Sequence, residues 1–168
     1  KIERVVVLGA NGTMGFGSAA LFTTAVPHVT FLARTREKAE EGLAAAIKQV
    51  RSPTVASRSA VGDYDNDLDA AVEKADLIFE TLTEDFAIKK DMFDRIEKAR
   101  RDDSIVATVT SGLSINQLCE GRSDSFRKNF MGLHFFNPPN VIVGTELIAG
   151  KDTDPELVDF IEAFSTIR

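Results

Sequence analysis

The chain has 168 residues, 43% hydrophobic and 27% charged, which is enough for one globular domain with a sizeable core. Its formal net charge of −6 argues against a nucleic-acid-binding surface, and it has neither a bilayer-length apolar run nor a signal-peptide pattern. The single cysteine, Cys119, cannot form a disulfide within the chain, so we expect a cytoplasmic protein.

A glycine-rich turn follows the first predicted strand. Residues 2–8 form a valine-rich apolar run typical of a buried parallel strand, and residues 9–17 lead into helix-forming residues. In a dinucleotide-binding unit of this kind, Gly9 permits the tight turn, Gly12 lets the backbone approach a pyrophosphate, and Gly15 lets the helix pack closely. The free N–H groups of the helix N-terminus then bind the phosphates. The alternative is a purely structural strand-to-helix turn.

The first two glycines of this turn are one residue further apart than in the standard G-x-G-x-x-G spacing. Ala10 and Asn11 fill the gap, and asparagine tolerates a left-handed backbone better than most residues. We therefore expect Asn11 to accommodate the longer turn. We count it, together with Thr13 and Met14 at the start of the helix, among the cofactor-binding residues.

The end of the second predicted strand, residues 29–32, bears on the choice of cofactor. An NAD-binding domain usually has Asp or Glu there to hold the ribose hydroxyls, but this chain has Ala33 followed by Arg34. An arginine at this corner can pair with the 2′-phosphate of NADP. Alternatively, Arg34 and Arg36 are solvated residues that open a charged helix. We expect NAD as the cofactor, with NADP as the alternative.

The remaining chain alternates strands and helices, which predicts an α/β fold with a Rossmann-like, doubly wound, mostly parallel sheet. The predicted helices comprise residues 36–50, 68–74, 86–100, 114–119 and 155–167. The predicted strands or extended segments comprise residues 55–61, 76–82, 105–108, 130–135 and 141–148. Ligands bind at the carboxyl ends of the strands in such sheets, so we expect Glu84, Ser111 and His134 to face the cleft at the glycine turn.

Residues 131–139 hold the candidate catalytic base. His134 lies between Leu133 and Phe135, and Glu146 follows twelve residues later. A carboxylate that returns from a turn could fix one imidazole tautomer and stabilise its charged form, as a general base requires. The alternative is a buried strand histidine that bonds to a backbone carbonyl, with two prolines ending the strand.

Together these motifs resemble the NAD-binding domain of the L-3-hydroxyacyl-CoA dehydrogenases of fatty-acid β-oxidation. The resemblance covers nearly the whole chain and is most specific at residues 134–138, His-Phe-Phe-Asn-Pro, with Glu146 at the family's interval. Residues 12–17 match the second half of the family's glycine turn. Residues 80–89 look like its acid-rich strand end and lysine-bearing helix, and residues 110–113 match its serine-bearing loop.

The resemblance implies an oxidoreductase that converts an L-3-hydroxyacyl-CoA to the 3-oxoacyl-CoA with NAD or NADP. His134 would be the general base and Glu146 would orient it and stabilise the imidazolium. Ser111 and Asn137 would hydrogen-bond the substrate oxygen or its surroundings. No metal is implied.

The same resemblance places Glu84 and Lys89 near the cofactor or the CoA arm. Three residues depart from the family's pattern: Ala33 replaces the ribose-binding acid, and Val109 and Gly112 replace an asparagine and a serine near the nicotinamide. Two alternatives therefore stay open. One is a non-catalytic nucleotide-binding module with a decayed site, and the other is a Rossmann β-hydroxyacid reductase, which typically uses a catalytic lysine.

We expect residues 1–168 to be the dinucleotide-binding domain of a longer protein. The resemblance implies a C-terminal helical domain that closes the acyl-CoA cleft and forms a homodimer. We therefore expect little turnover from residues 1–168 alone.

Overall fold

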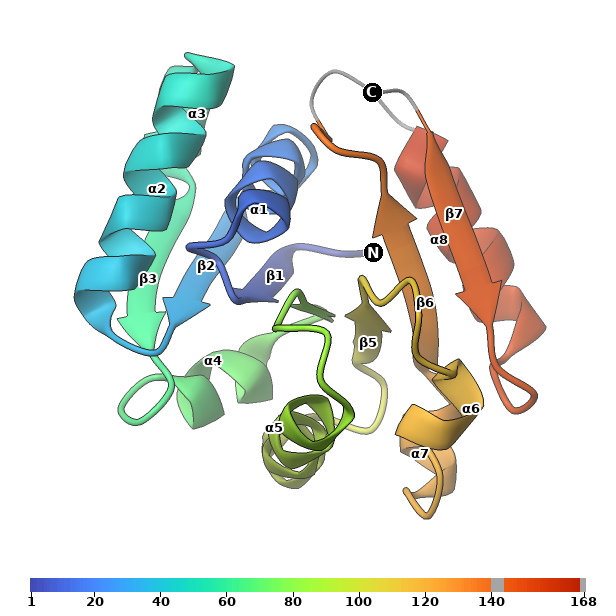
Figure 1. The fold of residues 1–168 in the computed structure, drawn as a ribbon. Coiled ribbons are helices and arrows are strands. Elements are labelled where there is room, and N and C mark those ends of the chain that lie inside the picture. The colour runs from blue at the N-terminus through green and yellow to red at the C-terminus, as the bar shows by residue number, and fades with distance from the viewer. Residues whose placement is uncertain (140–143, 167–168) are drawn as a thin grey trace.

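The structure, a computed structural model, describes residues 1–139 and 144–166. Within these residues, seven strands form one sheet in the order β3-β2-β1-β4-β5-β6-β7, with helices on both faces (Figure 1). Strands β1 to β6 pair in parallel, and β7 pairs antiparallel to β6. This is the doubly wound dinucleotide-binding order with one antiparallel strand added at the edge, so the predicted fold class is confirmed.

The strands are β1 (Arg4–Leu8), β2 (His28–Ala33), β3 (Ser59–Asp63), β4 (Leu77–Glu80), β5 (Ile105–Thr108), β6 (Phe130–Phe135) and β7 (Thr145–Ala149). The helices are α1 (Thr13–Ala25), α2 (Arg36–Val50), α3 (Pro53–Ser57), α4 (Leu68–Lys74), α5 (Phe86–Ala99), α6 (Ile115–Leu118), α7 (Asp124–Lys128) and α8 (Pro155–Thr166).

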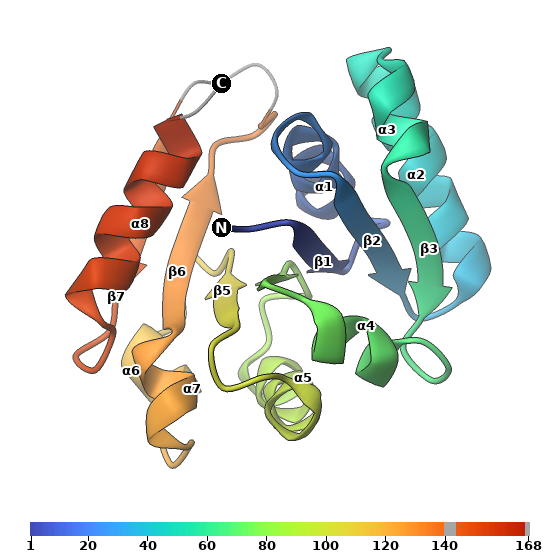
Figure 2. The same ribbon diagram turned by 180° about the vertical axis from the view of Figure 1, so that it is seen from behind.

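A separate hydrophobic core lies on each face of the sheet. Figures 1 and 2 show α4 to α7 gathered on one side, and α1 on the other side with α2 and α8 beside it. On the α1 side, Phe22, Phe79 and Phe135 form a cluster with ring centroids 5.4 to 5.8 Å apart. Because the parallel strands bury side chains on both faces, they appear in the sequence as continuous apolar runs.

The prediction of a strand over residues 55–61 is wrong in its first half. Ser52 Oγ accepts a hydrogen bond from Thr54 N–H, and Pro53 occupies the first helical position. A side-chain cap followed by proline favours a helix start, so α3 forms before β3 begins at Ser59.

The predictions near the C-terminus are less complete. The short helix α7, capped by Ser123, is not among the predicted elements. Residues 141–143 of the last predicted strand lie outside the described residues, and β7 begins at Thr145. No helix in the described part of the chain has the length and apolar character needed to cross a membrane.

Candidate active site

The glycine turn joins β1 to α1 where the strand order reverses between β1 and β4. Gly9 has a φ of +75°, and a Cβ atom added there would lie 2.8 Å from the carbonyl oxygen of Thr81, just after β4. A Cβ at Gly15 would lie 2.0 Å from the carbonyl oxygen of Gly9, because α1 starts in contact with the turn. The fold therefore requires glycine at both positions.

The extra residue in the turn is accommodated in a way that the sequence did not predict. Arg51 is the only non-glycine residue with positive φ in the described chain, so the turn does not use the tolerance of Asn11 for a left-handed backbone. Instead, Ala10 N–H donates to the carbonyl oxygen of Leu32 in β2 at 3.1 Å. The turn then meets α2 at Gly42, where a Cβ would lie 2.2 Å from the Ala10 oxygen.

The N-terminus of α1 is suited to an anion. Gly12 is its N-cap residue, no side chain caps it, and its first turn contains no acidic residue. The leading N–H groups, at Thr13 and Met14, and the positive end of the helix dipole are thus available for a diphosphate. A Cβ atom added at Gly12 would make only an ordinary 3.5 Å contact with Gly9. The packing of the protein does not require glycine there, so its surface is open for a ligand to approach the backbone.

A pocket of about 540 Å³ lies against this turn. Four predicted cofactor-binding residues line it: Gly9, Asn11, Gly12 and Arg34. Its size is typical of cofactor sites, and its place beside the end of β2 is where the adenosine ribose of a dinucleotide lies in this fold.

Tyr64, just after β3, is a pocket residue that was not predicted. Its hydroxyl oxygen accepts the N–H of Gly9 at 2.9 Å and so fixes the start of the glycine turn. Burial raises the pKa of Tyr64 to about 12, which keeps the hydroxyl neutral. An aromatic residue at the end of a strand, next to an acidic loop, was the available signal.

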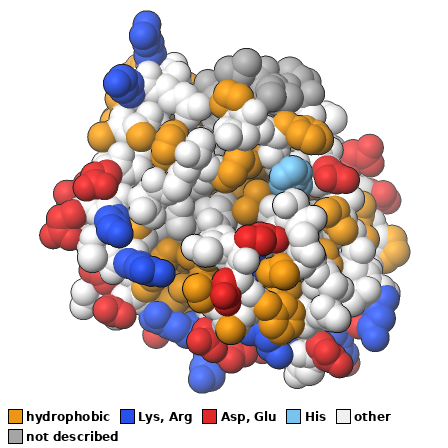
Figure 3. Space-filling model, viewed as in Figure 1, with side chains coloured by type: hydrophobic (Ala, Val, Ile, Leu, Met, Phe, Trp, Pro, Cys, Tyr) orange, Lys and Arg blue, Asp and Glu red, His pale blue; other side chains and the backbone are white. Residues whose placement is uncertain are grey.

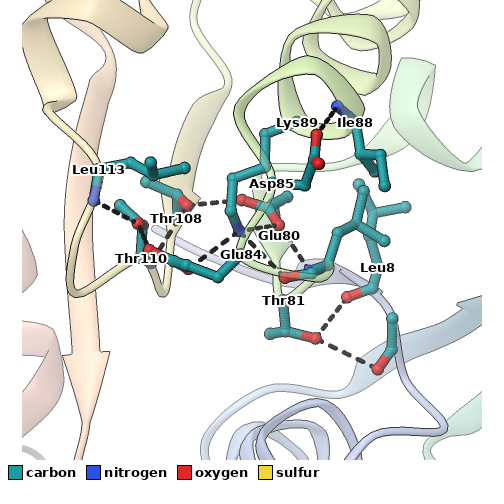
Figure 4. A network of polar contacts seen from close by, with 12 residues as sticks. Leu8, Glu80, Thr81, Glu84, Asp85, Ile88, Lys89, Thr108, Thr110 and Leu113 are labelled. Carbon is teal, nitrogen blue, oxygen red and sulfur yellow. Dashed lines mark hydrogen bonds and ion pairs between the residues drawn. The ribbon is translucent and has the colours of Figure 1, made fainter.

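A buried ion pair joins helix α5 to the end of β4 (Figure 4). Lys89 Nζ lies 2.7 Å from Glu80 Oε1, and both side chains are 0% exposed. The ammonium also donates to the carbonyl oxygen of Leu82 at 3.1 Å. Because it has no exposed surface, Lys89 cannot contact a cofactor or a CoA arm in this arrangement. The expected place of Lys89 near the cofactor or the CoA arm is therefore corrected to a buried position that supports the loop after β4.

Glu84 connects the same loop to the end of β5. Its carboxylate accepts hydrogen bonds from Thr110 Oγ1 and, at 3.1 Å, from Gly112 N–H. Partial burial pushes the pKa of Glu84 up, but these bonds and the charge of Lys89 outweigh it, so the pKa lies below the usual carboxyl value. The anion thus holds the loop that carries the exposed Ser111.

Strands β6 and β7 bring the predicted catalytic pair together. His134 and Glu146 are direct partners in the antiparallel ladder, with Nδ1 3.7 Å from Oε2. This distance is too long for a hydrogen bond, and Nδ1 is buried without a hydrogen-bond partner among residues 1–139 and 144–166. The glutamate side chain is 60% exposed and can rotate toward the ring. No backbone carbonyl of the described residues bonds to Nδ1, so the structure gives no support to the alternative of a histidine satisfied in that way.

The loops that follow β5 and β6 lie at the same end of the sheet. Thr108, the last residue of β5, pairs with Gly132 in β6. Two residues further along each strand direction, Thr110 is therefore level with His134. On the face drawn in Figure 3, a histidine shows beside an acidic side chain, near a hollow with hydrophobic side chains.

The exposed Asn137 belongs to a loop that contacts α1. A Cβ at Gly17 of α1 would lie 3.1 Å from Pro139 Cδ. The helix that begins at the glycine turn therefore also supports the loop after His134. Ser111, His134, Glu146 and Asn137 come from three neighbouring strand ends, whereas Lys89 is buried against Glu80 at the end of β4.

The chain is similar to proteins of one family. The model of the family described as 3-hydroxyacyl-CoA dehydrogenase, NAD binding domain, matches residues 4–167. The chain is 32% identical over 192 residues to a probable 3-hydroxyacyl-CoA dehydrogenase of Bacillus subtilis, which covers 97% of this chain and 24% of that protein. It is 33% identical over 170 residues to a 5-formyl-3-hydroxy-2-methylpyridine 4-carboxylate 5-dehydrogenase of Mesorhizobium japonicum, with 94% and 52% covered.

Solved structures show the same similarity. The (S)-3-hydroxybutyryl-CoA dehydrogenase PaaH1 from Ralstonia eutropha matches with a TM-score of 0.84 and 28% sequence identity, over 98% of this chain and 60% of that chain. The two curated relatives are longer than the matched region, since the chain spans 24% and 52% of their lengths.

Proposed function

Since the chain belongs to the 3-hydroxyacyl-CoA dehydrogenase family, of which it is the NAD-binding domain, we propose that it supplies the cofactor site and the catalytic base of such an enzyme. The proposed reaction is the oxidation of an L-3-hydroxyacyl-CoA to the 3-oxoacyl-CoA in fatty-acid β-oxidation. The observation that carries the proposal is the pairing of His134 with Glu146 at the strand ends beside α1.

In this proposal His134 accepts the proton of the substrate 3-hydroxyl. Because Nδ1 faces Glu146, the proton goes to the other ring nitrogen, Nε2. Glu146 then stabilises the imidazolium and keeps the ring in one orientation. A dinucleotide held in this cleft would supply the acceptor for the hydride that leaves C3. A positioned general base typically contributes about 10²–10⁴-fold to the rate.

The other site residues bind and position. The N–H groups of Thr13 and Met14 hold the diphosphate of the cofactor, and Gly12 leaves it room. Ser111 and Asn137, on exposed loops at the same end of the sheet, hydrogen-bond the substrate oxygen or its surroundings.

Two alternatives fit the structure less well. Lys89 cannot serve as the catalytic lysine of a reductase, because its ammonium is fully buried against Glu80. In a decayed module, nothing would hold a carboxylate opposite an imidazole nitrogen that has no other partner. The ladder pairs Glu146 with His134, and no other described side chain or backbone group bonds to Nδ1.

Other parts of the proposal concern the whole protein. A C-terminal helical domain that closes on the acyl-CoA and forms a homodimer stays a prediction, supported by the greater length of the curated relatives. A cytoplasmic location is supported by the free, buried Cys119.

The test is His134→Ala in the full-length protein, assayed with L-3-hydroxybutyryl-CoA and either cofactor. We expect activity to fall about 10²–10⁴-fold while cofactor binding is retained. The control is His28→Ala, which removes the exposed histidine at the start of β2. Full activity of His134→Ala would refute the assignment. Oxidation of a pyridine substrate, as named for the Mesorhizobium relative, in place of the acyl-CoA would refute the substrate class.

A further inference from the structure

We propose that the adenosine end of the cleft binds a 2′-phosphorylated ribose, so that this member of an NAD-binding family prefers NADP(H) to NAD(H). The inference rests on the proposed function, because it concerns the same cleft. It is carried by two features of the end of β2: a missing carboxylate and a cluster of cations.

The carboxylate that would bind the ribose hydroxyls and repel a 2′-phosphate is absent from β2. Ala33 stands in its place and is fully buried. Its partner on β3 is Asp63, the nearest candidate to replace it. The Asp63 Oδ1 atom, however, accepts hydrogen bonds from the Asn66 N–H at 2.7 Å and from Nδ2 at 3.0 Å, and Oδ2 accepts one from Nδ2 at 3.0 Å. Asp63 is committed to its own turn and does not line the pocket.

Three cationic side chains line the pocket at this place. Arg34 follows β2, Lys38 lies in the first turn of α2, and Arg95 reaches over from α5. The Arg95 guanidinium donates to the carbonyl oxygen of Tyr64 at 2.7 Å, which fixes it at the pocket wall. Among the described lining residues, the one carboxylate is Asp91, on the α5 side.

Lys38 lies on the face of α2 that meets the glycine turn. Helix α2 can approach Ala10 only because position 42 is glycine, as the 2.2 Å contact of an added Cβ shows. Lys38 lies four residues before Gly42 and therefore on the same face of α2. The close packing of α2 against the glycine turn thus holds this cation at the pocket.

This chemistry selects a phosphate monoester. Such a group carries about −1.5 to −2 charges at neutral pH, and arginine can bind its oxygens through two parallel hydrogen bonds. A ribose without the phosphate offers only neutral hydroxyls, for which the pocket lacks the usual carboxylate acceptor. The absence of the acid at the end of β2 and the presence of three cations in the pocket both favour NADP(H).

The test is a pair of titrations of the full-length protein with NADPH and NADH, followed by cofactor fluorescence. We expect NADPH to bind at least about tenfold more tightly, and Arg34→Ala to weaken NADPH about 10- to 100-fold with little change for NADH. Calorimetry with 2′,5′-ADP and 5′-AMP should give the same difference. The preference should decrease as salt concentration rises.

Two further variants sharpen the test. Ala33→Asp should reverse the preference. Because Ala33 is buried, Arg34→Glu provides a second reversal at an exposed position. Arg36→Ala is the matched control, since Arg36 is exposed, pairs with Glu40 at 3.6 Å and does not line the pocket.

The outcomes separate the two proposals. Tighter binding of NADH, or equal weakening of both cofactors by Arg34→Ala, would overturn the inference and leave the proposed function standing. Failure of the folded protein to bind either cofactor would overturn the proposed function itself.

Discussion

Lys89 and Glu80 form an ion pair in which neither side chain has exposed surface, with Nζ 2.7 Å from Oε1. The same carboxylate accepts hydrogen bonds from Thr108 Oγ1 and Leu82 N–H, each at 2.5 Å (Figure 4). One buried pair therefore ties the end of β4 to α5, to β5 and to the loop at the cofactor cleft. It stabilises the residues around the cleft and, because both side chains are fully buried, offers no surface that a ligand could contact.

Removal of one partner of this pair should be costly. Lys89→Met leaves the Glu80 carboxylate buried without its cation, so we expect the free energy of unfolding to fall by about 3–5 kcal/mol. Urea denaturation measures it. Lys90→Met is the control, because Lys90 lies next in sequence and its ammonium only covers the Phe86 ring at 5.6 Å. The double variant with Glu80→Gln should recover much of the loss; a double variant as unstable as Lys89→Met would contradict this account.

The position of Lys89 shows what the sequence could not predict. The chain order of strands and helices follows from apolar runs and glycine turns, and it places the strand ends of the site correctly. The direction of a helical lysine relative to the sheet depends on tertiary packing. The family's pattern, which has a lysine at this position, predicts Lys89 at the cleft, but the position lies on the buried face of α5 with Met92, Phe93 and Ile96.

The glycine turn gives a second example. Asparagine tolerates a left-handed backbone, which suggested how Asn11 could lengthen the turn. In the structure the neighbouring Ala10 instead bonds to β2 and packs against α2. That solution depends on Gly42, which is distant in sequence and has no local signature. The meeting of His134 with Glu146 was expected from a carboxylate that returns after a turn, whereas the antiparallel ladder that pairs them is seen only in the structure.

Two glycines of the turn should respond differently to alanine. Gly15→Ala places a Cβ 2.0 Å from the Gly9 carbonyl oxygen, so we expect both the stability and the dinucleotide affinity to fall, with about 1–3 kcal/mol lost in unfolding free energy. Gly12→Ala meets only a 3.5 Å contact, so we expect a smaller loss of stability, from the poorer N-cap residue alone, while dinucleotide affinity falls. Thermal melting and cofactor titration of both variants test this. A Gly12→Ala protein that binds as well as the parent would show that the diphosphate lies elsewhere.

Glu84 should make part of the stability depend on pH. Its pKa is below the usual carboxyl value, so its ionised form stabilises the folded state above the pKa of the unfolded chain. This stability is lost as the pH falls through the lower folded-state value. We therefore expect the difference in unfolding free energy between the parent and Glu84→Gln to be largest near neutrality and to vanish in acid. Urea denaturation from neutral to acidic pH measures it, with Glu162→Gln on the exposed side of α8 as the control. A difference that stays constant over the range would contradict the assigned hydrogen bonds.

Glu146→Gln tests whether the negative charge of Glu146 contributes to the reaction of His134. This substitution keeps the size of the side chain opposite His134 but removes the negative charge beside Nδ1, which is 3.7 Å from Oε2 in the parent. The imidazolium that forms when His134 takes the substrate proton would lose its counter-charge, so we expect kcat with L-3-hydroxybutyryl-CoA to fall at least about tenfold. The KM for the cofactor should stay the same, because Glu146 does not line the described adenosine pocket. Steady-state kinetics of the full-length protein give both values. An unchanged kcat would mean that Glu146 is only an exposed residue of the edge strand β7 and takes no part in the reaction. Another group would then have to act on Nδ1 of His134.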